Sequence, residues 1–71
     1  MADYPLTREP EDIAVIVQLP RAQAYALAQL CKRIGWSDCE GLSVSKGETQ
    51  SMVNATDRVR SALEDAGVYV R

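Results

Sequence analysis

The chain has 71 residues, a formal net charge of −2 at neutral pH and no histidine. This length allows one small domain, and a composition of 46% hydrophobic and 25% charged residues excludes a disordered, collagen-like or disulfide-scaffold protein. Without histidine the chain lacks the commonest general base and the usual imidazole ligand of zinc. We therefore expect a non-enzymatic protein with no catalytic residues, no cofactor and no metal site.

The negative charge is concentrated near the N-terminus. Residues 1–12 carry four acidic side chains against one arginine, a net charge of −3, whereas residues 13–71 carry six acidic against seven basic side chains, a net charge of +1. Pro5, Pro10 and the lack of periodicity predict an extended acidic arm over residues 1–12, followed by a single domain over residues 13–71. The nearly neutral domain shows no basic patch, which speaks against a nucleic-acid partner.

Residues 13–19, IAVIVQL, predict a β-strand because most of their side chains are β-branched and the run ends at Pro20. Alternate side chains of a strand point to opposite faces, and both faces of this run are mostly apolar. The apolar part, Ile13 to Val17, is too short to cross a bilayer, and no signal-like leader precedes it. We therefore expect a cytoplasmic protein without a membrane partner.

After Pro20 the apolar residues recur at helical spacing and predict a helix over about residues 20–34, with Gly35 in a left-handed conformation just after its end. Cys31 lies in this helix and Cys39 follows it. In a chain without a secretion signal, both are expected to be reduced, packed thiols.

Two capping patterns divide the rest of the domain. Ser37 with Glu40 predicts a short helix that ends by Gly41, and Ser45 with Glu48 opens a long helix over about residues 46–66, closed by Gly67. In the long helix, one apolar stripe is expected to face the core: Met52, Ala55, Val59, Ala62, Leu63 and Ala66. Residues 68–71, VYVR, are a candidate for a short C-terminal strand.

These elements predict an α+β fold of one strand and two main helices. A lone strand cannot satisfy its own backbone groups, so it needs the tail strand, its own copy in a second chain or a different protein. The small size of the domain favours a homodimer through residues 13–19. A monomer in which Val68 to Val70 pairs with residues 14–18 is the alternative.

The unit from Val15 to Pro20, VIVQLP, followed by an amphipathic helix, resembles the start of ribbon-helix-helix repressors. That resemblance implies a DNA-binding transcriptional regulator in which the strand pairs with its dimer mate and reads the major groove. Gln18 would be the base reader, and Arg21 would support it. The acidic arm departs from this pattern because DNA repels it.

Two longer stretches, VQLPRAQAYALAQLCKRIGWSDC and VRSALEDAGVYVR, resemble small proteins carried by plasmids, phages and integrative elements of proteobacteria. Such elements often use non-enzymatic proteins of this size to block host defence complexes. The resemblance implies an anti-CRISPR protein, which inhibits a host CRISPR-Cas effector complex by occlusion. An accessory or antitoxin-like subunit is a further alternative.

Two segments are candidates for the partner-binding surface of such an inhibitor. Acidic side chains of the arm could occupy a groove that is lined with Lys and Arg for nucleic acid. Tryptophan is a common interface anchor, although in a domain without phenylalanine core packing is its usual role. The candidate residues are Glu9, Glu11 and Asp12 in the arm, and Trp36, Asp38 and Glu40 after the first helix.

Overall fold

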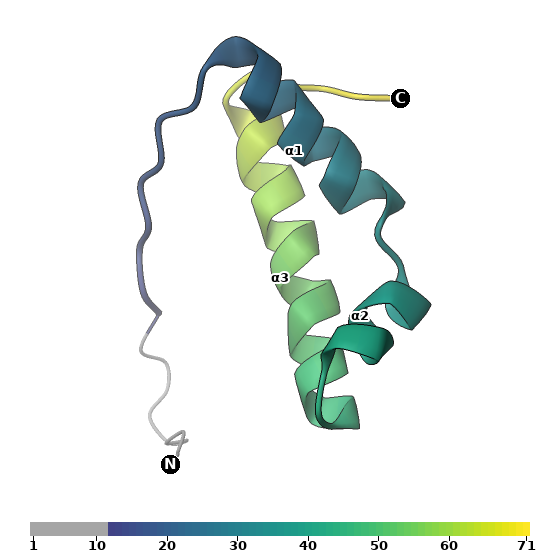
Figure 1. Ribbon diagram of the computed structural model, residues 1–71. Coiled ribbons are helices and arrows are strands. Elements are labelled where there is room, and N and C mark those ends of the chain that lie inside the picture. Colours follow the sequence, from purple (N-terminus) through teal and green to yellow (C-terminus); the bar gives the residue numbers. More distant parts are fainter. Residues whose placement is uncertain (1–11) are drawn as a thin grey trace.

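A computed structural model describes residues 12–71, which form three α-helices and no β-strand (Figure 1). Helix α1 spans Arg21–Arg33, α2 spans Trp36–Leu42 and α3 spans Lys46–Asp65. The two longer helices lie side by side, and α2 packs across the N-terminal half of α3 (Figure 1). The predicted α+β fold is therefore wrong, and the described part of the chain is all-helical.

The predicted strand over residues 13–19 is an extended segment that pairs with no other part of residues 12–71. It stands away from the helices, and no backbone hydrogen bond joins residues 12–19 to another described residue (Figure 1). Residues 68–71, the predicted tail strand, are also irregular. The β-branched side chains favour an extended backbone, but a strand also requires the hydrogen bonds of a neighbour, which residues 12–71 do not supply.

Helix α1 confirms the predicted first helix within one residue at each end. Pro20 precedes its first turn with φ −55°, a value close to that which the proline ring imposes. Lys32 and Arg33 occupy the last turn, where positive charge complements the helix dipole. Ile34 and Gly35 then continue in extended conformations, so the left-handed backbone expected at Gly35 is wrong.

The short helix begins one residue earlier than its capping pattern predicts. The side chain of Asp38 accepts a hydrogen bond from the backbone N–H of Gly35 at 2.9 Å, which places Gly35 at the N-cap and Ser37 inside the helix. The carboxylate of Asp38 therefore satisfies a donor that the glycine N-cap leaves open, and it also lies near the positive end of the helix dipole.

The capping pattern of α3 is confirmed. The hydroxyl of Ser45 accepts from the N–H of Glu48 at 3.1 Å, and the Glu48 carboxylate accepts from the N–H of Val44 at 2.8 Å. At the other end, Gly67 has φ +94°, the left-handed region that favours glycine, and the Val68 N–H bonds back to the carbonyl of Leu63 at 2.8 Å.

The core is small. Among the described residues, the fully buried ones are all of modest size: Ala28, Cys31, Cys39 and Thr49. The Thr49 side chain is 0% exposed, and its hydroxyl contacts the Ser43 hydroxyl and donates to the Ser45 carbonyl at 3.0 Å. These bonds tie the α2–α3 connection to the first turn of α3. No large aliphatic or aromatic side chain of the described residues is buried.

The face that α3 turns inward differs from the predicted apolar stripe. The α3 positions that lose most of their exposure are Thr49, Met52, Val53, Thr56, Arg60, Leu63 and Glu64. Most of the predicted stripe stays exposed instead: Ala55, Val59, Ala62 and Ala66. The stripe is present in the sequence, but it lies on a face of α3 that neither α1 nor α2 covers.

Candidate functional site

The described residues hold no group of three Cys, Asp or Glu side chains arranged to bind a metal ion. None of the helices in the part of the chain that the structure describes is both long enough and apolar enough to cross a membrane. Three surfaces of the described residues are candidates for binding instead.

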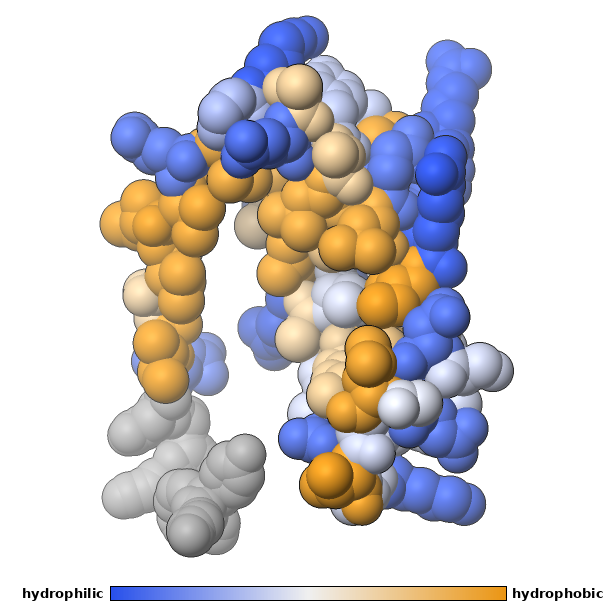
Figure 2. Space-filling model, viewed as in Figure 1, coloured by the Kyte–Doolittle hydropathy of each residue, from blue (hydrophilic) through white to orange (hydrophobic). Residues whose placement is uncertain are grey.

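The first surface is a groove between the extended segment and α3. Val15, Val17 and Leu19 line it from the extended segment, Leu27 lines it from α1, and part of the apolar stripe lines it from α3. The groove has a volume of about 380 Å³. Figure 2 shows it as a hollow between the extended segment and the helices, with hydrophobic side chains along the segment. Its lining, here called the apolar groove, is Val15, Val17, Leu19, Leu27, Val59, Ala62, Leu63 and Ala66.

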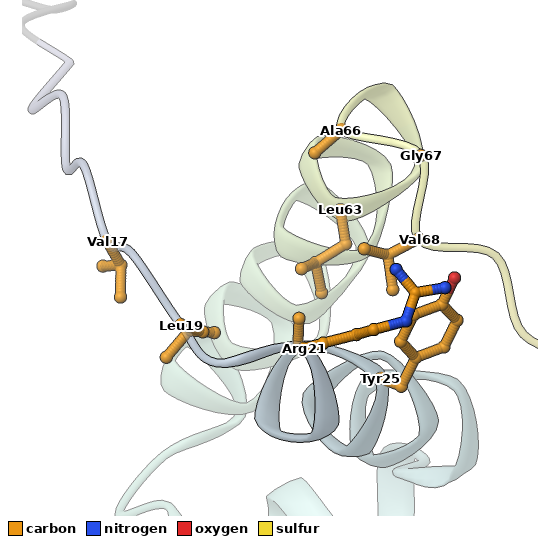
Figure 3. Close-up of a pocket in the computed structure, with 9 residues that line it drawn as sticks. Val17, Leu19, Arg21, Tyr25, Leu63, Ala66, Gly67 and Val68 are labelled. Atoms are coloured by element: carbon orange, nitrogen blue, oxygen red, sulfur yellow. The ribbon is translucent and has the colours of Figure 1, made fainter.

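The second surface continues the apolar groove at the start of α1. Figure 3 shows the guanidinium of Arg21 lying over the ring of Tyr25, and its Cζ atom is 5.1 Å from the ring centroid, within the range of a cation–π contact. Val17 and Leu63 line both hollows, so the two are continuous. Arg21 thus places a positive charge at the end of the surface that continues the apolar groove.

The third surface lies on α2. Trp36 is 42% exposed and Glu40, one turn later, is also exposed, so the two side chains share one face, here called the α2 face. Cys39 points into the core from the same helix. Trp36 is therefore only partly packed, and the exposed part of its indole is available to a partner.

The residues proposed from sequence are not brought together in one site. Asp12 is exposed at the start of the described chain, and α2 lies on the other side of α3 (Figure 1). Glu9 and Glu11 lie outside the described residues. Asp38 is committed to the N–H of Gly35, which leaves Trp36 and Glu40 as the free part of that candidate set.

The two proposed DNA readers also have separate environments. Gln18 is exposed on the extended segment, whereas the Arg21 guanidinium is held over Tyr25. Arg21 is exposed as well, so both predicted DNA-binding residues lie on the surface, Gln18 on the extended segment and Arg21 at the start of α1.

Sequence reasoning missed the apolar groove. Its signal was present, because the i, i+3 and i+4 spacing from Val59 to Ala66 predicted an apolar stripe. The stripe was assigned to the core since a pattern of this kind does not reveal which element covers it. The opposite wall was assigned to a strand with two apolar faces, and these are the same side chains that now stand uncovered.

The thiol of Cys31 is buried where α1 packs against α3, near Arg60. Burial raises the pKa of the Cys31 thiol, and the nearby positive charge of Arg60 only partly offsets this effect. A thiol whose pKa is raised stays protonated and is a poor nucleophile at neutral pH. The Nε of Arg60 lies 3.7 Å from a Glu64 carboxylate oxygen, an ion pair too long for a hydrogen bond.

Residues 1–71 match the profile of one protein family, described as a family of unknown function (DUF7706). No curated protein and no solved structure matches the chain significantly. The match covers the whole chain, and the chain therefore belongs to the DUF7706 family.

Proposed function

We propose that this family member is a non-enzymatic protein-binding module. One observation supports the proposal above the others: the described domain buries four modest side chains and leaves ten large hydrophobic ones exposed. Contiguous exposed apolar surface on a small domain is typical of a protein-interaction site. The largest part of that surface is uncharged, which suits a protein partner better than nucleic acid.

The α2 face is the part of this surface best suited to a different protein. Tryptophan and tyrosine are over-represented among the residues that dominate binding energy, and an exposed Trp36 beside Glu40 offers an apolar anchor with a polar rim. A large target that presents a pocket for the indole would be bound there.

The specific form that we propose is inhibition of a host CRISPR-Cas effector complex by occlusion. This step rests on the resemblance of the two stretches to proteins of mobile genetic elements. Charge supports it: residues 1–12 carry a net charge of −3, and the channels in which such complexes hold nucleic acid are lined with Lys and Arg. The arm would compete for the channel while the α2 face anchors the inhibitor.

The experiment is an interference assay in cells that carry an active effector and a targeted plasmid. Expression of the chain is expected to restore plasmid survival. Trp36→Ala, and separately the triple charge reversal of Glu9, Glu11 and Asp12 to Lys, are expected to reduce that survival at least tenfold. Tyr69→Ala, another exposed aromatic outside the α2 face, is the matched control and should inhibit like the wild type.

Direct binding by the purified chain separates the alternatives. Capture of effector subunits that survives nuclease treatment supports occlusion. In the interference assay, loss of the targeted plasmid with every effector type tested, despite expression of the chain, would contradict inhibition by occlusion. Affinity for duplex DNA that falls steeply with salt and requires Gln18 and Arg21 would indicate a DNA-binding regulator instead, and stoichiometric copurification with one encoded neighbour would indicate an accessory or antitoxin-like subunit.

A further inference from the structure

The extended segment is the most exposed apolar part of the described chain. Ile13 is 88% exposed, Val15 75%, Ile16 91% and Val17 64%. These side chains are consecutive or alternate along a backbone that makes no hydrogen bond to another described residue. Exposed apolar side chains gathered in one segment are typical of an interaction surface, and the unpaired backbone N–H and C=O groups of the segment are available to a neighbour.

We propose that this surface binds a second copy of this chain, whose residues 13–19 lie against the same segment and the apolar groove of the first copy. Each copy has one segment and one groove, and a two-fold axis would let each copy supply what the other lacks. The first argument for a second copy is this self-complementarity of shape and polarity.

The second argument is the chemistry of the surface. Residues 13–19 contain no charged side chain, and neither does the lining of the apolar groove. Interfaces between different proteins that meet transiently are about as polar as the rest of the surface, whereas homodimer interfaces are more apolar. A uniformly uncharged surface on both walls therefore fits a permanent contact between identical chains.

The third argument is area. Fully covering one Val, Leu or Ile side chain removes about 60–120 Å² of apolar surface from water. Two copies of the four exposed side chains Ile13, Val15, Ile16 and Val17 would thus contribute about 500–1,000 Å². The flanking groove residues and the backbone bring the total into the range of about 1,200–2,000 Å² that stable interfaces bury.

Sedimentation of the full chain tests the proposal. The wild type is expected to sediment as a dimer at about 100 μM, and Ile16→Asp is expected to weaken association at least a hundredfold, because it places one carboxylate from each copy in an uncharged interface. Val44→Asp is the matched control: Val44 is 92% exposed, lies outside the segment and the groove, and should leave association unchanged.

If Ile16→Asp does not fold, a thermal melt of the wild type, followed by circular dichroism, still tests the proposal. The melting temperature of a dimer rises with protein concentration, so that of the wild type should rise over a hundredfold concentration range. Association should also be insensitive to salt, since no charged side chain takes part. A monomeric wild type with a constant melting temperature, or equal dimerisation by Ile16→Asp, would overturn the proposal. The effect of Trp36→Ala in the interference assay is independent of it, because Trp36 lies outside the proposed contact.

Discussion

At the scale of single residues, Cys31 shows how burial acts on a titratable group. Its side chain packs between α1 and α3, and burial raises the pKa of its thiol. A raised pKa means that the folded state holds the proton more tightly than the unfolded chain does. The resulting stabilisation is fully present below the pKa of the unfolded thiol, 9.0, and is lost as the pH rises through the higher folded value.

Comparison with Cys31→Ala isolates this effect. At pH 7 the substitution should lower the free energy of unfolding by about 1 kcal/mol, since it leaves a small cavity. Above about pH 9 the wild type loses the thiol contribution and the variant does not, so the difference between the two should narrow. Urea unfolding of both proteins at pH 7 and pH 10 measures the difference in their free energies of unfolding. A difference that stays constant or widens would show that the thiol is not titrating in the way the burial implies.

At the scale of the elements, local signals were enough for the helices. The α1 and α3 ranges followed from apolar spacing, from the cap at Ser45 and from the terminating Gly67, all of which act within one turn of the chain. The strand over residues 13–19 failed for the opposite reason. Its side chains set the local backbone, but pairing depends on a distant partner that no local pattern specifies.

Two glycines test the helix-terminating rule in opposite directions. Gly67 has φ +94° with open space around it, so Gly67→Ala should cost about 1 kcal/mol or more through backbone strain alone. Gly41 lies within α2, also in open space and without a positive φ, so Gly41→Ala should stabilise by up to about 1 kcal/mol. The denaturant midpoints of Gly67→Ala and Gly41→Ala, each compared with that of the wild type, measure these two effects. Equal effects of the same sign would mean that the left-handed turn is not what closes α3.

At the scale of the whole molecule, the same apolar residues that sequence assigns to a core lie on the outside. Val59, Ala62 and Ala66 keep their helical spacing, yet α1 packs against a neighbouring face of α3 that includes Thr56 and Arg60. Sequence periodicity therefore located the apolar groove correctly on α3 but could not say whether this chain or another covers it. The prediction that the stripe faces the core of this chain is wrong, because most of its residues are exposed. Trp36 and Glu40 were candidates from the sequence, but a single tryptophan gives no local signal of whether its indole is packed or exposed.

Amide hydrogen exchange distinguishes covered from uncovered surface residue by residue. If a second copy lies on the extended segment, the backbone N–H groups of residues 13–19 lose contact with water, and their exchange should slow at least tenfold in the wild type relative to Ile16→Asp. Amides of α1 and α3 are hydrogen bonded within their own helices in either state and serve as the internal reference. Free exchange at residues 13–19 in a protein that still sediments as a dimer would place the contact between copies on another surface. The exposed Leu30 of α1 would then be the first position to substitute, since it is 56% exposed and belongs to neither the apolar groove nor the α2 face.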